Sequence, residues 1–117
     1  MGRIMVSPEP PNFWTPLLYR CHGLAPRQAR RLWRACIRCT HPEVVAWRYT
    51  LGRADEQLSK MTDADLKRFI AKDWSPPTLI KVLEHLVTEG LLQRTEANHL
   101  EDAILKSTNK QGSWKHG

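Results

Sequence analysis

Basic side chains capable of binding phosphate are concentrated in one segment of the sequence, residues 26–39. Its arginines recur at helical spacing, and the resulting stripe consists of Arg27, Arg31, Arg34 and Arg38, with Arg30 beside it. Guanidinium groups bind phosphates and carboxylates through paired hydrogen bonds. Like charges at this spacing repel by roughly 0.2–0.5 kcal/mol per pair, and the segment contains no acidic residue. The pattern therefore favours contact with a polyanion, and the alternative is an ordinary solvated face.

Three cysteines and a histidine suggest a second chemistry, metal binding. Cys36 and Cys39 form a C-x-x-C pair, with Cys21 before it and His41 after it. These are the ligand types of a Cys₃His zinc site. Both members of the pair, however, fall in the last turn of a predicted helix, and cysteine is also common in apolar cores. We expect free thiols and no bound metal, with zinc as the alternative.

The sequence lacks the residue patterns that are typical of enzyme active sites. The sequence has no glycine-rich phosphate loop, no paired carboxylates in an apolar setting, and no serine or cysteine nucleophile with a suggestive histidine. Its histidines are scattered along the chain, at His22, His41, His85, His99 and His116. We expect a binding protein that is not an enzyme and that needs no cofactor.

The formal net charge of +6 is unevenly distributed along the chain. Residues 1–53 contain nine arginines and no lysine against two acidic residues, whereas residues 54–117 contain nine basic and ten acidic residues. Arginine is preferred for bidentate phosphate recognition, so an arginine-only half indicates a polyanionic partner. The base composition of the source genome could also favour arginine, but the lysines of the second half argue against this as the full explanation.

The elements that position these arginines are predicted to be short amphipathic helices. The first is the arginine-bearing segment 26–39. Thr40 and Glu43 fit a capping box for the next helix, which is expected to stop at Gly52. Residues 53–61 are polar and are expected to form a connector, with room for one helical turn.

The stretch 62–92 contains two further capped helices joined by a tight turn. Thr62 caps helix 63–72, and Ser75 caps helix 76–89, whose apolar stripe faces a core. Two short helices with such a turn and a Gly-Leu-Leu exit resemble the helix-turn-helix segment of winged-helix DNA-binding proteins. The residues that carry the resemblance are Leu66, Ser75, Thr78, Leu79, Leu83, Leu86, Gly90, Leu91 and Leu92, with Gly90 at the left-handed position beyond the helix.

This resemblance implies that the second helix enters the major groove of DNA and reads bases with its N-terminal residues. In this sequence that role falls on Ser75, Thr78 and Lys81. Arg48, in the helix after Thr40, could extend the basic surface. The alternative is a helical hairpin that belongs to the core of an all-α protein and reads nothing.

The ends of the chain frame a single predicted domain, residues 12–106. Residues 1–11 are rich in proline and are expected to form a flexible arm, and residues 107–117 a mobile polar tail. Segment 12–19 is dense in aromatic and aliphatic groups, which should pack on the core; docking of a partner protein is the alternative. A last helix, 96–106, is expected to cover the hairpin or a second subunit. Together these patterns predict an all-α bundle of four to six short helices.

The favoured function is nucleic-acid binding by a small DNA-binding regulatory or accessory protein, with DNA favoured over RNA. Arginine contacts to phosphate would supply affinity, and contacts to bases would supply specificity. The alternative is a helical adaptor in a larger assembly, whose arginines meet an acidic protein surface. No apolar run approaches the roughly 20 residues of a membrane span, so we expect a cytoplasmic protein with no membrane partner.

Overall fold

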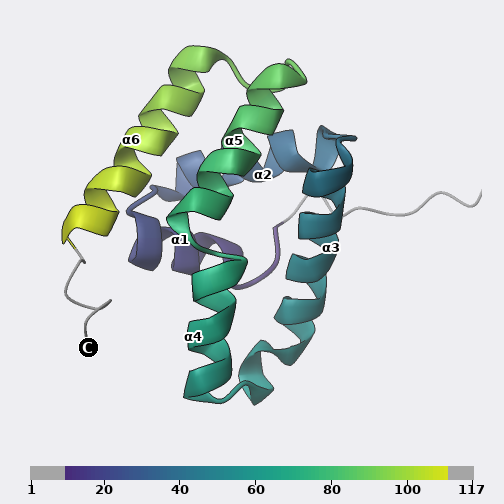
Figure 1. Cartoon of the computed structure of the whole chain (residues 1–117), viewed down its shortest axis with the longest axis vertical. Coiled ribbons are helices and arrows are strands. Elements are labelled where there is room, and N and C mark those ends of the chain that lie inside the picture. The colour runs from purple at the N-terminus through teal and green to yellow at the C-terminus, as the bar shows by residue number, and fades with distance from the viewer. Residues whose placement is uncertain (1–9, 111–117) are drawn as a thin grey trace, which may run out of the picture.

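Six α-helices and one 3₁₀ turn make up the computed structural model, which describes residues 10–110 (Figure 1). The helices are α1 (Trp14–His22), α2 (Pro26–Arg38), α3 (Pro42–Gln57), α4 (Asp63–Lys72), α5 (Pro76–Thr88) and α6 (Arg94–Lys110), and the turn is η1 (Leu58–Lys60). The described residues contain no strand, so the predicted all-α bundle is confirmed. None of the described helices is both long and apolar enough to cross a lipid bilayer.

Local capping explains where α4 and α5 begin. The Thr62 hydroxyl accepts a hydrogen bond from the backbone N–H of Asp65 at 3.1 Å, and the Asp65 carboxylate accepts one from the N–H of Thr62 at 3.4 Å. Ser75 caps α5, because its Oγ accepts the backbone N–H of Thr78 at 3.4 Å. Gly90 follows α5 with φ of 76°, the left-handed conformation that glycine adopts without strain. The predicted starts of both helices and the predicted role of Gly90 are therefore confirmed.

The third helix, α3, differs from the predicted helix at both its start and its end. Its N-cap is His41 rather than Thr40, and His41 Nδ1 accepts a hydrogen bond from the backbone N–H of Glu43 at 3.1 Å. The helix also continues through Gly52, which does not adopt a positive φ. Its buried face extends past this glycine to Ala54, so packing outweighs the weak helix preference of glycine. Most of the predicted connector 53–61 is consequently helical.

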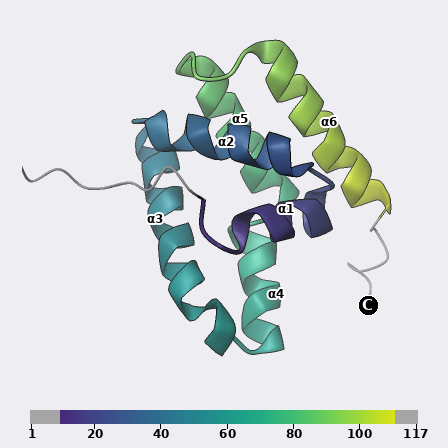
Figure 2. The same cartoon turned by 180° about the vertical axis from the view of Figure 1, so that it is seen from behind.

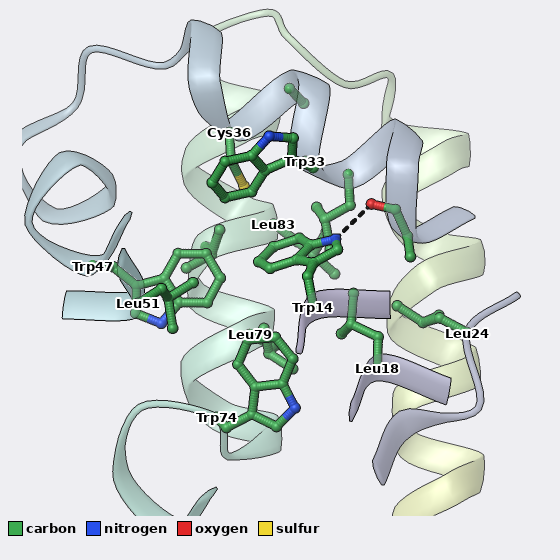
Figure 3. Close-up of a cluster of buried hydrophobic side chains, with 14 of the residues drawn as sticks. Trp14, Leu18, Leu24, Trp33, Cys36, Trp47, Leu51, Trp74, Leu79 and Leu83 are labelled. Atoms are coloured by element: carbon green, nitrogen blue, oxygen red, sulfur yellow. Dashed lines mark hydrogen bonds between the residues drawn. The ribbon is translucent and has the colours of Figure 1, made fainter. Parts of the chain in front are cut away.

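Four tryptophans meet at the centre of the core (Figure 3). Trp14 lies among Trp33, Trp47 and Trp74 in edge-to-face contacts, with ring centroids 5.0, 5.8 and 5.5 Å away. Its Nε1–H donates to the backbone C=O of Ala29 at 2.8 Å, which satisfies a buried donor and joins α1 to α2. The segment predicted to pack on the core does so through Phe13, Trp14, Leu17 and Leu18.

The helices are arranged so that α2 and α5 lie on opposite faces of the molecule. α5 stands in front of α2 in Figure 1 and behind it in Figure 2. After the reversal at Gly90, α5 packs along α6, whereas α4 and α5 run end to end in both views. The helices that fold back on each other after Gly90 are therefore α5 and α6. The apolar stripe of α5 is buried, while α4 buries chiefly Phe69 and offers little surface for a hairpin partner.

The last helix, α6, begins at Arg94, two residues before the predicted start, and extends past the predicted end of the domain at residue 106. Ser107, assigned by sequence to the mobile tail 107–117, is 8% exposed. Its hydroxyl donates to the backbone C=O of Cys21 in α1 at 3.1 Å. The boundary at residue 106 is thus wrong, because the C-terminal part of α6 packs against α1.

The predicted flexible segments lie largely outside the described residues, since residues 1–9 and 111–117 are not part of the description. Of the expected arm 1–11, Pro10 and Pro11 are described, and both are half-buried. The C=O of Pro11 accepts a hydrogen bond from the N–H of Trp14 at 3.0 Å. These two prolines therefore lead directly into α1.

Candidate nucleic-acid interface

The outer face of α2 carries a row of exposed arginines, here called the arginine surface. It consists of Arg27, Arg30, Arg34 and Arg38. The row faces solvent because the opposite side of the same helix buries Leu32 and Cys36 completely in the core. Within the described part of the chain, none of these four arginines takes part in an ion pair or a side-chain hydrogen bond. No acidic side chain among the described residues therefore lies within ion-pairing distance of these four arginines.

Arg31 differs from its neighbours on α2 because Glu96 of α6 neutralises it. Its Nε and Nη2 donate to the two carboxylate oxygens of Glu96 at 2.9 and 3.0 Å, which is a bidentate pair. The hydrogen bonds from Arg31 lower the pKa of Glu96, and the carboxylate in turn raises the pKa of Arg31. The sequence places Arg31 in the phosphate-binding stripe, whereas in the structure its charge is already matched. The Arg31 side chain nonetheless remains 44% exposed.

Arg48, expected to extend the basic surface, is half-buried on α3. Its Nη2 donates to the backbone C=O of Cys39 at 3.3 Å, and its buried Nε has no hydrogen-bond partner among the described residues. This contact connects α3 to the residue that follows α2. Arg48 therefore supports the junction between the two helices and adds no freely exposed cation to the arginine surface.

Two of the three proposed base-reading residues, Ser75 and Thr78, form hydrogen bonds within the protein. The hydroxyl oxygens of Ser75 and Thr78 lie 2.9 Å apart, and Thr78 Oγ1 donates to the backbone C=O of Lys72 at 2.7 Å. Both side chains are half-buried and hold the turn between α4 and α5. Lys81 is exposed, but α5 lies on the face opposite α2 (Figures 1 and 2). The structure gathers the arginines of α2 into one surface and leaves these three residues apart from it.

The cysteines and His41 do not assemble into a metal site. In the described part of the chain, no group of three His, Cys, Asp or Glu side chains is arranged to hold a metal ion. Cys36 and Cys39 are buried free thiols, and burial raises the pKa of Cys36 far above its usual value, which disfavours the thiolate that zinc requires. His41 instead caps α3 and stacks on His85, with ring centroids 3.9 Å apart.

An open groove of about 370 Å³ lies between α2 and α6, beside the arginine surface. It is lined by Arg27, Gln28, Arg31, Glu96, His99 and Leu100. Its surface is mostly apolar, and the buried side chain of Leu100 is among the residues that line it. Sequence reasoning missed the contribution of α6 to this site. The acidic outer face of that helix, opposite an arginine stripe with no acid of its own, was the available signal.

Comparisons of the chain with models of protein families, with curated protein sequences and with solved structures found no match. Function is therefore inferred from the geometry and charge of this surface, because a fold by itself does not define a function.

Proposed function

We propose that the protein binds nucleic acid through the arginine surface, with the phosphate backbone as its principal ligand. The observation that carries this proposal is the row of exposed arginines on α2 that have no acidic partner among the described residues. From residue 27 to residue 38 the row extends over about 16 Å, at the helical rise of 1.5 Å per residue. A nucleic-acid strand presents several phosphates over such a length, at about 3.4 Å of helix axis per nucleotide.

Phosphate binding also accounts for the charge pattern of α2. Arginines at helical spacing repel one another, and phosphates that lie between them remove this repulsion while releasing condensed counterions. Contacts to phosphate carry little sequence information, so the interaction is expected to be salt-sensitive and weakly sequence-specific. Binding to DNA in a regulatory or accessory role is the form of this function that the sequence favours.

A salt titration of affinity tests the proposal. If each of the four arginines contacts one phosphate, the slope of log K against log salt should be about −3.6 on duplex DNA and about −2.8 on a single strand. The double variant Arg30→Glu/Arg34→Glu removes two of the four contacts. Its slope should therefore fall to roughly half, with an affinity at least about tenfold lower near 50 mM salt.

The matched control is Lys67→Glu/Lys72→Glu, which makes the same change in net charge at two exposed positions of α4. α4 leads into the start of α5 and lies away from the outer face of α2 (Figures 1 and 2). The control should retain most of the affinity, and equal losses in both variants would show that net charge alone governs binding. If the unaltered chain binds neither DNA nor RNA near 50 mM salt, the arginine surface faces an acidic protein partner instead.

A further inference from the structure

The groove between α2 and α6 adjoins the arginine surface and shares Arg27 with it. Its volume of about 370 Å³ lies within the roughly 300–1,000 Å³ typical of small-ligand sites. Leu100, 4% exposed, forms an apolar base, and charged or polar groups surround it. We infer that this groove accepts one unpaired base of a single-stranded nucleic acid whose phosphates lie on the arginine surface. The inference rests on the proposed function and specifies its substrate.

Arg31 supplies a flat stacking surface because Glu96 fixes its guanidinium plane. The bidentate contact, at 2.9 and 3.0 Å, uses one edge of the guanidinium, and the side chain is 44% exposed and lines the groove. Unpaired bases stack on arginine planes and on aromatic or histidine rings in single-strand recognition. An ion pair this exposed contributes little to stability, but its bidentate geometry defines the orientation of the Arg31 guanidinium plane when the pair is formed.

His99 of α6 provides a second planar group in the lining of the groove. It is exposed and lies three residues after Glu96, so both residues occupy one face of α6 and line the same groove. The two stacking groups thus come from different helices, Arg31 from α2 and His99 from α6. A base in this groove would have planar groups as neighbours and the apolar surface of Leu100 beneath it.

Continuity of charge identifies the occupant of the groove as part of a nucleic acid. Arg27 stands at the edge of the groove, and the remaining arginines extend the positive charge along α2 away from it. A strand whose backbone follows this row passes the groove and can turn one base inward. In an uninterrupted duplex that base is paired and stacked, and its extrusion costs free energy. Single strands, loops and bulges are therefore preferred over continuous duplex.

An abasic strand separates the contribution of the base from that of the phosphates. A single-stranded oligonucleotide and an abasic strand of equal length carry the same backbone charge. In a fluorescence anisotropy titration, the protein should bind the strand with bases about 5- to 150-fold more tightly, which is the effect of one stacked base. It should also prefer that strand to a duplex of the same length. DNA and RNA versions of the strand show which sugar is preferred.

Substitutions in the groove test which residues cause the difference in affinity between the strand with bases and the abasic strand. His99→Ala should lose affinity for the strand with bases and leave affinity for the abasic strand unchanged. Arg31→Lys keeps the positive charge but removes the flat face, so it should have the same effect without altering the salt dependence. Asn98→Ala, at an exposed neighbouring position of α6 outside the groove, is the control and should bind both strands as the unaltered protein does.

The outcomes distinguish the groove from the arginine surface. Equal affinities for the two strands, with a steep salt dependence intact, would overturn base binding and leave phosphate binding in place. Tighter binding to duplex than to single strand would overturn base binding as well. Failure to bind any of these strands would remove the proposed function and, with it, this inference.

Discussion

His22 is a titratable side chain that the core encloses, with 2% of its surface exposed. Its Nε2–H donates to the backbone C=O of Trp74 at 2.9 Å, while the buried Nδ1 has no hydrogen-bond partner within the described part of the chain. A neutral ring needs only one donor contact, so this environment suits the neutral form. Burial lowers the pKa of His22, and the hydrogen bond to Trp74 opposes the shift only in part.

The lowered pKa predicts that the fold loses stability in mild acid. Above the ordinary pKa of 6.5, His22 is neutral in both the folded and the unfolded chain. Below it the unfolded chain binds a proton that the folded chain resists, so the free energy of unfolding decreases until the folded pKa is also passed. Urea denaturation at several pH values between about 5 and 8 measures this decrease.

The variant His22→Gln isolates the effect. Glutamine keeps an N–H donor for the C=O of Trp74 but does not titrate. Its stability should therefore depend less on pH between 5 and 7 than that of the unaltered protein, whatever the other histidines contribute. An identical pH dependence in both proteins would show that His22 is not the responsible group.

At the scale of helices, Gly52 and Gly90 have different roles: Gly52 lies inside a helix, and Gly90 ends one. Gly52 lies inside α3 with helical backbone angles, and a Cβ added there would contact nothing within 4 Å. Gly52→Ala should therefore stabilise the fold by about 0.4–1 kcal/mol, because alanine lowers the entropy of the unfolded chain. The midpoint of urea denaturation measures the gain.

Gly90 is the matched comparison, since a Cβ added there also meets open space. Its φ of 76°, however, is strained for any residue with a side chain. Gly90→Ala should destabilise the protein by about 1 kcal/mol or more, because the turn between α5 and α6 needs this conformation. Similar effects of both substitutions would contradict the assignment of Gly52 to the interior of a helix.

At the scale of the whole molecule, α6 contacts α2 near one of its ends and α1 near the other. Near the start of α6, Glu96 binds Arg31 of α2, and near its end the Ser107 hydroxyl satisfies the C=O of Cys21 in α1. Carbonyls in the last turn of a helix have no partner within that helix, so Ser107 completes α1. The helix α6 therefore forms one wall of the groove beside the arginine surface and also packs against α1.

Ser107→Ala tests this closing contact. The substitution removes the hydrogen bond to Cys21, and the expected loss of unfolding free energy is about 0.5–1.5 kcal/mol, the usual range for such a bond. Lys106→Ala, one residue earlier on the exposed side of α6, should change stability by less than about 0.5 kcal/mol. Chemical denaturation of both variants provides the comparison, and a loss as small for Ser107→Ala as for the lysine variant would contradict the contact.

Much of the local structure of this chain could be read from its sequence. Thr62, Ser75 and Gly90 act through backbone groups within a few residues, so their caps and turn were predictable. The apolar stripes that form the core were predictable from their helical spacing, and the packing of segment 12–19 from its density of apolar side chains. His41 as a cap was missed because a histidine ring in that role carries a weaker pattern than the Thr40 hydroxyl beside it.

Sequence alone determined that the chain is helical and where α2, α4 and α5 start. It also determined that α2 bears arginines on one side. Each of these properties depends on residues within one or two helical turns of one another. Tertiary structure alone decided that Arg31 pairs with Glu96, 65 positions along the chain, and that α5 faces away from the arginine surface. Helix packing sets which side chains meet across the molecule, and amphipathic helices of similar pattern can pack in several ways. The uncompensated arginines and the groove beside them are therefore products of that packing.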